Sequence, residues 1–360
     1  MTEFWVLDET YKLKGVIDNY KSVIWTERFN TNGDFEIYCQ KNEYNYNILR
    51  LNSDTCTPVF IMRSDDTSKM AILTDVKYTF SPEDGEMIVA SGYTDDYLLH
   101  YRVIFEQANY FGNAEYAIRH MVQNAFIHNE FGYHTRNTND LILGSMIGLA
   151  DTYRIDAQYQ GVYLDEAISK TCQDLGIGYG ISFNAATNKF VFNIAVGQSR
   201  PSVIFSVNLD NILSSEYTNK VKPNTIYAIG VGDGVNRYVG EYDTEATERT
   251  GLFRQELYVD ADKVSNNGDS FNILSYVNLL KGAAKQEYAD KYSNNETIES
   301  SVVTNSYRLG IDYNLGDIVT TILTVGVNGG TLKKLQQRVV EIVECWDDNG
   351  YTCEPSFETV

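Results

Sequence analysis

Short runs in which apolar and polar residues alternate fill the first hundred positions of the chain. Turn-forming clusters separate these runs at spacings of roughly ten residues, from Phe4 to about Tyr101. Alternation with a period of two is typical of β-strands, and short strands at regular spacing predict a small barrel or sandwich. The pattern therefore predicts a β domain over residues 1–101.

One hairpin of this domain carries charges inside its strands. The Asn-Gly pair of the NTNGD turn tolerates positive φ and predicts a hairpin over residues 23–39. Because neighbouring side chains of a strand point to opposite faces, Trp25, Glu27 and Phe29 share one face. A half-buried sheet in water is the favoured interpretation, and a surface that meets another protein is the alternative. Glu27 and Glu36 could face each other across the hairpin, although exposed strand charges explain them better.

After the β domain the apolar period changes to that of a helix. Apolar residues at three-to-four spacing predict one helix over 113–126, whose first residue is an asparagine suited to an N-cap, and another over 163–175. A pair of strands follows at 178–184 and 189–197. The β pattern then returns, is interrupted by a long amphipathic helix at about 273–292, and ends the chain in three further runs.

Charge narrows the classes of function. The chain has 49 Asp and Glu against 29 Lys and Arg, a formal net charge of −20, and no dense run of cations relieves it. Affinity for a phosphate backbone depends on cations, so this balance disfavours sequence-independent nucleic-acid binding. An anionic wall repels DNA, which still suits a conduit that DNA passes without adhering. With 360 residues, 43% of them hydrophobic, two to four domains with sizeable cores are expected.

The sequence predicts neither a signal peptide nor a membrane-spanning segment, because no basic segment precedes a long apolar run and no stretch of about 18 apolar residues occurs. An odd number of cysteines without a CxxC pair predicts reduced thiols in a protein made in a cytoplasm. These cysteines are Cys39, Cys56, Cys172, Cys345 and Cys353. A disulfide between Cys345 and Cys353, on the two arms of the last hairpin, is a disfavoured alternative.

No motif for a catalytic or metal site stands out. Of the close histidines His120, His128 and His134, the first two lie eight residues apart on one helix, roughly 12 Å along its axis, which is too far for one ion. The glycines of GIGYG (176–180) leave a helix and open a strand, the reverse of a dinucleotide loop. GVGDG (230–234) is better explained as a turn, and the many carboxylates have no diagnostic spacing. The sequence therefore predicts no catalytic residue, no cofactor and no metal.

Seven segments together carry a family resemblance. The most specific is the first hairpin, through Ile24, Trp25, Thr26, Glu27, Arg28, Phe29, Gly33, Asp34, Phe35 and Glu36. The others are SGYTDDYLLHYRVI, LILG, LDEAISKTCQDLGIGY, FSVNLDNILSSEYT, RQELYVDA and YNLGDIVT, which cover nearly the whole chain in order. The chain thereby resembles the tail-tip (baseplate) hub family of siphoviruses and prophages, which is similar to contractile-tail baseplate hubs and to the base of type VI secretion spikes. Tyr93 departs from the arginine common in that family.

The resemblance implies an α+β, mainly β fold with two related β-barrel domains and helix-containing inserted domains. Residues 1–101 would form the first barrel and 102–202 an α+β domain with two helices. Residues 203–240 plus 302–360 would form the second, discontinuous barrel, with a helical insert at 241–301. The family's long C-terminal extension is not expected, so the hub alone is implied.

The resemblance also implies a homotrimer whose barrels alternate around a pseudo-sixfold ring with a central channel. Such a ring would close the distal tail tube at the tail tip of the virion, after synthesis in the host bacterial cytoplasm. The implied partners are the distal tail protein or tail tube, the tape measure protein, and fibre or receptor-binding proteins, with DNA passing through. Two alternatives are a tail-associated peptidoglycan hydrolase, which would need an added catalytic domain or cleft, and a receptor-binding adhesin, for which tyrosine-rich loops give some support.

Eight residues are candidates for the subunit interface: Trp25, Glu27, Arg28, Phe29, Asp34, Phe35, Glu36 and Asp317. The charged members of the hairpin are expected to pair within or between subunits. Under this hypothesis, reversing the charge of Arg28 to glutamate weakens the assembly.

Overall fold

The computed structural model describes residues 2–51, 57–219, 221–245, 249–262, 264, 272–292, 296–302, 306–327 and 330–360. The chain divides into two compact units. The first is Met1–Ser215 with Glu299–Glu358 and Val360, and the second is Glu216–Ile298 with Thr359. Strands account for 47% of the residues and helices for 22%, so the expected mainly β class is confirmed.

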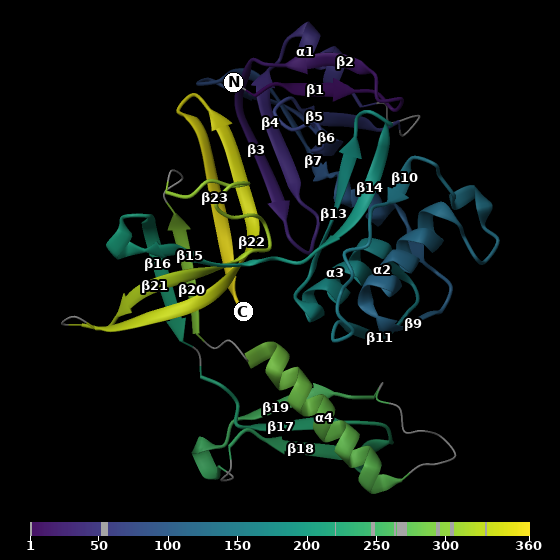
Figure 1. The fold of residues 1–360 in the computed structure, drawn as a ribbon, viewed down its shortest axis with the longest axis vertical. Helices are drawn as coiled ribbons and strands as arrows, with labels where there is room; N and C mark the ends of the chain where they lie inside the picture. The colour runs from purple at the N-terminus through teal and green to yellow at the C-terminus, as the bar shows by residue number, and fades with distance from the viewer. Residues whose placement is uncertain are drawn as a thin grey trace. The chain divides into compact units, whose positions relative to one another are not determined.

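Eleven strands of the first unit form one sheet (Figure 1). The strands are β1 (Phe4–Leu7), β2 (Leu13–Ile17), β3 (Tyr20–Arg28), β4 (Asp34–Gln40), β5 (Val59–Arg63), β6 (Met70–Ser81), β7 (Gly85–Thr94), β15 (Ser199–Ser206), β21 (Ile318–Val325), β22 (Thr331–Asp347) and β23 (Gly350–Thr359). Their order is β15-β21-β22-β3-β4-β7-β6-β5-β1-β2, with β23 paired to β22.

The long strand β22 makes this sheet continuous. Its first half pairs with β21, from Thr331 to Arg338, and its second half pairs with β3, from Glu341 to Asp347. In Figure 1 the yellow β22 and β23 accordingly lie beside the purple β3 and β4. Strands expected in two separate barrels therefore hydrogen-bond into one sheet, and the described strands close no barrel. The division into two related barrels stays a prediction.

The segment between β7 and β15 contains both expected helices. Its elements are β8 (Val103–Ile104), β9 (Ala108–Asn113), α2 (Ala114–Val122) with a π-helical turn at Gln123–Ile127, β10 (Leu141–Leu143), β11 (Arg154–Tyr159), β12 (Val162–Tyr163), α3 (Leu164–Leu175), β13 (Gly178–Asn184) and β14 (Lys189–Ala195). Asn113 caps α2 by accepting a hydrogen bond from the backbone N–H of Glu115, and Gly176 ends α3 with φ +64°. Both helices are thus confirmed with the expected ends. A further short helix, α1 (Glu43–Leu49), was not expected.

Both faces of β5 and of the first four residues of β6 are buried. Phe60 and Ile72 on one face belong to a core that includes residues of α2, α3, β13 and β14. Ile61 and Ala71 on the other face belong to a core that includes Trp346 of β22. A strand covered on both faces is apolar throughout, as the runs VFIM and MAIL are. The segments expected as separate domains at 1–101 and 102–202 therefore share a core.

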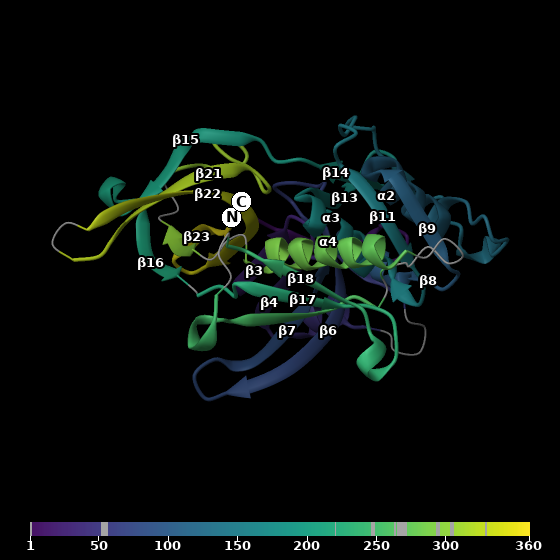
Figure 2. The same ribbon diagram turned by 90° about the horizontal axis from the view of Figure 1, so that it is seen from below.

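The second unit is a three-stranded sheet with a helix on one face (Figure 2). The strands β17 (Thr225–Ile229), β18 (Val239–Asp243) and β19 (Glu256–Asp260) have the order β18-β17-β19. Tyr276, Leu280 and Ala284 of α4 (Ile273–Tyr292) are buried in its core. The expected boundary at residue 240 falls inside β18, because β17 pairs with β18 and β19 of this unit. The strands β16 (Ile212–Asn219) and β20 (Glu296–Val302) pair with each other.

The first hairpin is confirmed, but its turn and facing differ from expectation. Residues 29–33 form the loop between β3 and β4, and Gly33 is not among the glycines with positive φ. A Cβ on Gly33 would lie 2.2 Å from the backbone oxygen of Thr26, so close approach of the two strands explains this glycine. Glu36 stands opposite Ile24, which places Glu27 and Glu36 on opposite faces. The possibility that they face each other is wrong.

Gly33→Ala is expected to destabilise the first unit, because the new methyl group must push apart two hydrogen-bonded strands. The expected loss of unfolding free energy is roughly 1–3 kcal/mol, measured by urea denaturation. Gly282→Ala in α4 is the control, since a Cβ there meets no atom within 4 Å. It should stabilise that helix by up to about 1 kcal/mol. Equal losses in both variants would contradict the close-approach explanation.

Candidate functional site

A buried arginine links the first strands of the chain to the last. Arg63, at the end of β5, is only 4% exposed, and its guanidinium carbon lies 4.7 Å from the ring centroid of Trp346 and 5.7 Å from that of Trp25. It donates to both carboxylate oxygens of Glu344 on β22, at 2.5 and 3.1 Å, and to Asp65 at 2.8 and 3.0 Å. This bidentate, ring-flanked geometry compensates for the desolvation of a buried charge.

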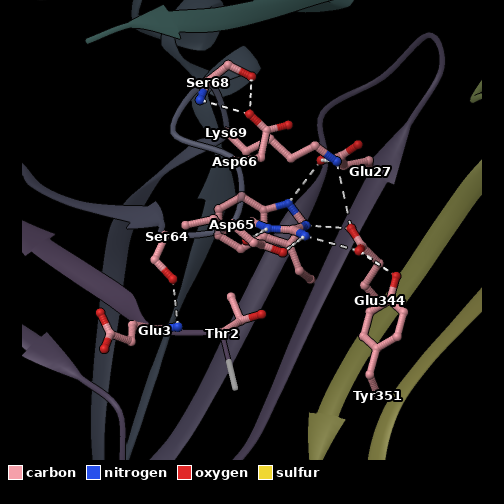
Figure 3. Close-up of polar contacts among 12 residues, drawn as sticks. Thr2, Glu3, Glu27, Ser64, Asp65, Asp66, Ser68, Lys69, Glu344 and Tyr351 are labelled. Carbon is pink, nitrogen blue, oxygen red and sulfur yellow. Dashed lines mark hydrogen bonds and ion pairs between the residues drawn. The ribbon is translucent and has the colours of Figure 1, made fainter. Parts of the chain in front are cut away.

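Further groups surround Glu344 (Figure 3). The hydroxyl of Tyr351 donates to it at 2.8 Å, and the Nζ of Lys69 lies 3.7 Å away. Lys69 also pairs with Glu27 of β3 at 2.7 Å. Burial opposes ionisation of Glu344, but the hydrogen bonds and charge of Arg63 outweigh it and hold its pKa below the ordinary value.

Arg28 makes a second link between the first hairpin and β22. Its guanidinium donates to Asp34 at 2.6 Å, to Glu341 at 2.7 Å and to the backbone oxygen of Asn32 at 3.0 Å. Three charges of the hairpin, Glu27, Arg28 and Asp34, therefore pair within the chain. Six residues, here called the charged junction, make these links: Glu27, Arg28, Arg63, Lys69, Glu341 and Glu344. Reversing the charge of Arg28 would break these pairs within the chain. A weakened assembly would therefore not be sufficient evidence that Arg28 lies at a subunit interface.

The aromatic candidates of the hairpin lie in the core. Trp25 and Phe35 are each 1% exposed. The Phe29 ring fits against two glycines of other matching segments, since a Cβ on Gly178 or Gly316 would lie within 2.5 Å of it. Three segments that carry the family resemblance thus meet at one phenylalanine. Glu36, the remaining member of the hairpin, is partly buried on β4.

Asp317 is also occupied within the chain. It is 3% exposed and accepts from the backbone N–H of Gln198 at 2.7 Å, that of Asn314 at 3.0 Å, and the Nε of Arg200 at 2.9 Å. It stands directly before β21 and anchors the segment that leads into β15. Its role as an interface residue stays a prediction.

Four residues of the charged junction, Arg63, Lys69, Glu341 and Glu344, were not identified from the sequence, and two of them carry a recognisable signal. Arg63 ends the apolar run PVFIMR, and Glu344 interrupts the run VVEIVECW. A single charge embedded in an apolar strand is the signal that could have found each of them, because such a charge needs a buried partner. Their pairing across 281 positions has no local signal.

Tyr93, the departure from the family pattern, begins a stack of aromatic rings. Its ring centroid lies 4.2 Å from that of Tyr97, which lies 4.8 Å from His100, which in turn lies 4.0 Å from Tyr163. The Nδ1 of His100 lies 3.1 Å from Asp165, which orients the imidazole. The stack connects the end of β7 to the start of α3.

The other candidate groups form no reactive site among the described residues. No group of three or more His, Cys, Asp or Glu there could hold a metal ion, and His120 pairs with Glu130 at 2.9 Å. The described cysteines, Cys39, Cys172, Cys345 and Cys353, are free thiols, and burial raises the pKa of Cys39 to about 11. Cys56 lies outside the described residues. Within the described ranges, no helix has the length and apolar character needed to cross a membrane.

Glu344→Gln is expected to lower the free energy of unfolding by roughly 3 kcal/mol, because Arg63 would keep its buried charge and lose its buried counter-charge, with only the more exposed Asp65 left to pair with it. Chemical denaturation measures the loss. Replacing both residues, Arg63→Met with Glu344→Gln, should recover most of it. Asp174→Asn, in the exposed pair with Lys170, is the control and should leave the denaturation midpoint unchanged. A double variant no more stable than Glu344→Gln would refute the pairing explanation.

Asp96→Asn is expected to stabilise the protein by an amount that grows as pH rises from about 4 to about 7. Burial raises the pKa of Asp96 to about 7, so the folded chain keeps a proton that the unfolded chain releases near pH 4. Ionisation therefore destabilises the fold progressively as pH rises between about 4 and 7. Thermal melts should show equal Tm values near pH 4 and a higher Tm for the variant near pH 8. Asp75→Asn, at an exposed position of β6, is the control. A pH-independent difference would refute this account.

Solved structures share this fold over nearly the whole chain. A 43 kDa tail protein of prophage MuSo2 from Shewanella oneidensis is 12% identical with a TM-score of 0.57, over 99% of this chain and 98% of that one. A tail protein from Neisseria meningitidis MC58 is 13% identical with a TM-score of 0.57, over 98% and 96%. The prophage tail protein gp18 from Listeria monocytogenes EGD-e is 10% identical with a TM-score of 0.55, over 99% and 95%. Type VI secretion spike and VgrG-like proteins are also among the structural neighbours.

Among curated proteins none matches this sequence. A family model of phage tail proteins, described as Siphovirus ReqiPepy6 Gp37-like protein, matches residues 3–357. Neither the family model nor these structural neighbours point to a catalytic activity. With a match of that length, the resemblance found in the sequence is confirmed, and the chain belongs to the Siphovirus ReqiPepy6 Gp37-like family of phage tail proteins.

Proposed function

We propose that three copies of this chain form a ring that closes the distal end of the phage tail tube. The observation that carries the proposal is the family match over residues 3–357, together with a fold shared almost end to end with prophage tail proteins. In this role the chain is a structural hub. It joins the tube or distal tail protein to the fibre or receptor-binding components of the tip.

The charge of the chain supports a conduit. A net charge of −20 gives a surface that repels a phosphate backbone, so the tape measure protein and then DNA can pass the ring without adhering. A trimer with near-equivalent domains is also a simple way to match threefold tip components to a sixfold tube, because closed cyclic symmetry repeats the same contact.

The first unit has the rigidity that a ring subunit needs. The hydrogen bonds between β3 and β22 join the start and end of the chain, and two sets of buried or partly buried ion pairs reinforce the same contact. Force transmitted along the tail would therefore load a continuous sheet rather than a flexible connection. The function resides in shape and assembly, and no side chain is required to react.

The mass of the purified chain in solution tests this proposal. Native mass spectrometry over a range of concentrations should show a species of three chain masses, and particle images should show a threefold annulus. Adding the tail-tube or distal tail protein of the same phage should convert the annulus into a capped tube. A chain that stays monomeric at high concentration, both alone and with that partner, would rule out the ring.

A further inference from the structure

A pocket of about 220 Å³ lies beside the charged junction, and three junction residues, Glu27, Arg28 and Lys69, are among those that line it. Most of its walls come from β3, from the end of β7 with the turn that follows it, and from β13. Its lining includes Trp25, Glu27, Lys69, Asp95, Asp96 and Tyr179. All belong to the first unit.

The pocket has more negative charge than its own cations neutralise. Of its two cations, Lys69 pairs with Glu27 and lies near Glu344, while Arg28 is held by Asp34 and Glu341. Among the described residues, no ion pair reaches Asp95 or Asp96. Two carboxyl groups on the wall are therefore left without a counter-charge.

Asp95 is the more unusual of the two. It is only 4% exposed, yet its Oδ2 has no hydrogen-bond partner within the described structure. Asp96 is better satisfied, because one of its oxygens accepts the backbone N–H of Ile181. A buried carboxylate oxygen without a partner costs free energy, so Asp95 is built to receive a donor that the chain itself does not supply.

We propose that this pocket binds an alkylguanidinium group, the chemistry of an arginine side chain. A guanidinium is planar and presents paired N–H donors that match a carboxylate, and two adjacent aspartates, Asp95 and Asp96, line the space. Trp25 and Tyr179 provide aromatic walls, and Met70 and Leu315 provide apolar ones for a methylene stem. A volume of about 220 Å³ suits an organic cation better than a single ion.

The chain already holds one guanidinium in this way, that of Arg63 at the end of β5. The guanidinium of Arg63 lies near the rings of Trp25 and Trp346, and its N–H groups donate to the carboxylate of Glu344. The pocket offers a similar combination of ring and carboxylate, and its own arginine, Arg28, is already paired with Asp34 and Glu341. The proposal is independent of the ring, since a trimer could form whether or not the pocket is filled.

Binding is expected to release protons. Burial holds the pKa of Asp95 well above its ordinary value, with Asp96 and Glu27 adding to the rise, and it raises the pKa of Asp96 to about 7, with Glu27 contributing in the same direction. The other groups that face these carboxyls are Lys69 and Arg28, both already paired, and the phenol of Tyr179. A cation replaces the protons, so affinity rises as pH increases through about 7.

Calorimetric titration of the full chain with n-propylguanidinium chloride tests the pocket, with n-propylurea as the neutral probe of the same shape. One saturable site is expected near pH 8, with weaker binding near pH 6 and none for the urea. Asp95→Asn should weaken binding by at least about tenfold. Asp75→Asn makes the same charge change at an exposed site away from the pocket and should bind as the parent chain does.

Three results would overturn the proposal: no saturable binding by a chain that melts normally, equal binding of the urea, or equal weakening by Asp95→Asn and Asp75→Asn. Tighter binding of Ca²⁺, Mg²⁺ or Na⁺ in competition with the probe would also overturn it. Asp96→Asn is the second variant should Asp95→Asn fail to fold, and it should weaken binding too.

Native mass spectrometry shows which molecule supplies the guanidinium group. A saturating probe lowers the oligomer mass if another copy supplies the arginine, and leaves it unchanged if the guanidinium comes from elsewhere.

Discussion

The salt bridge between Arg63 and Glu344 is the contact on which the first unit depends. Each partner is almost fully buried, so neither can be left alone without a large desolvation penalty. Their pairing forces β5, β3 and β22 to meet in one arrangement, with Trp25 and Trp346 on either side of the guanidinium. The ion pair adds a directional requirement that apolar packing lacks, since its donors and acceptors must coincide.

That requirement explains the charges inside the first hairpin. Glu27 and Arg28 occupy adjacent positions on opposite faces of β3, and each reaches a partner from another part of the chain. Glu27 meets Lys69, whereas Arg28 meets Glu341 on the neighbouring strand. The hairpin therefore joins the amino-terminal strands of the first unit to its carboxy-terminal strands.

The same corner of the molecule also concentrates uncompensated negative charge. Asp95 and Asp96 directly follow β7, the strand that pairs with β4, and Asp96 contacts Ile181 of β13. Proteins rarely retain buried carboxyl groups without a use for them, because protonation or a bound cation must satisfy them. Contacts within the chain account for the charged junction and for the core around Phe29. They leave the Oδ2 of Asp95 without a hydrogen-bond partner, and the proposed ligand would supply one.

Local chemistry in the sequence determined the elements. The two-residue period gave the strands of the first domain, and the three-to-four period with Asn113 and Gly176 gave the helices and their ends. The seven matching segments gave the family. Tertiary structure alone decided that the strands join into one sheet, that Arg63 finds Glu344 281 residues away, and that Asp95 is buried beside a pocket. The reason is physical: periodicity and capping depend on neighbours within a few residues, whereas strand order and charge pairing depend on which distant surfaces exclude water together.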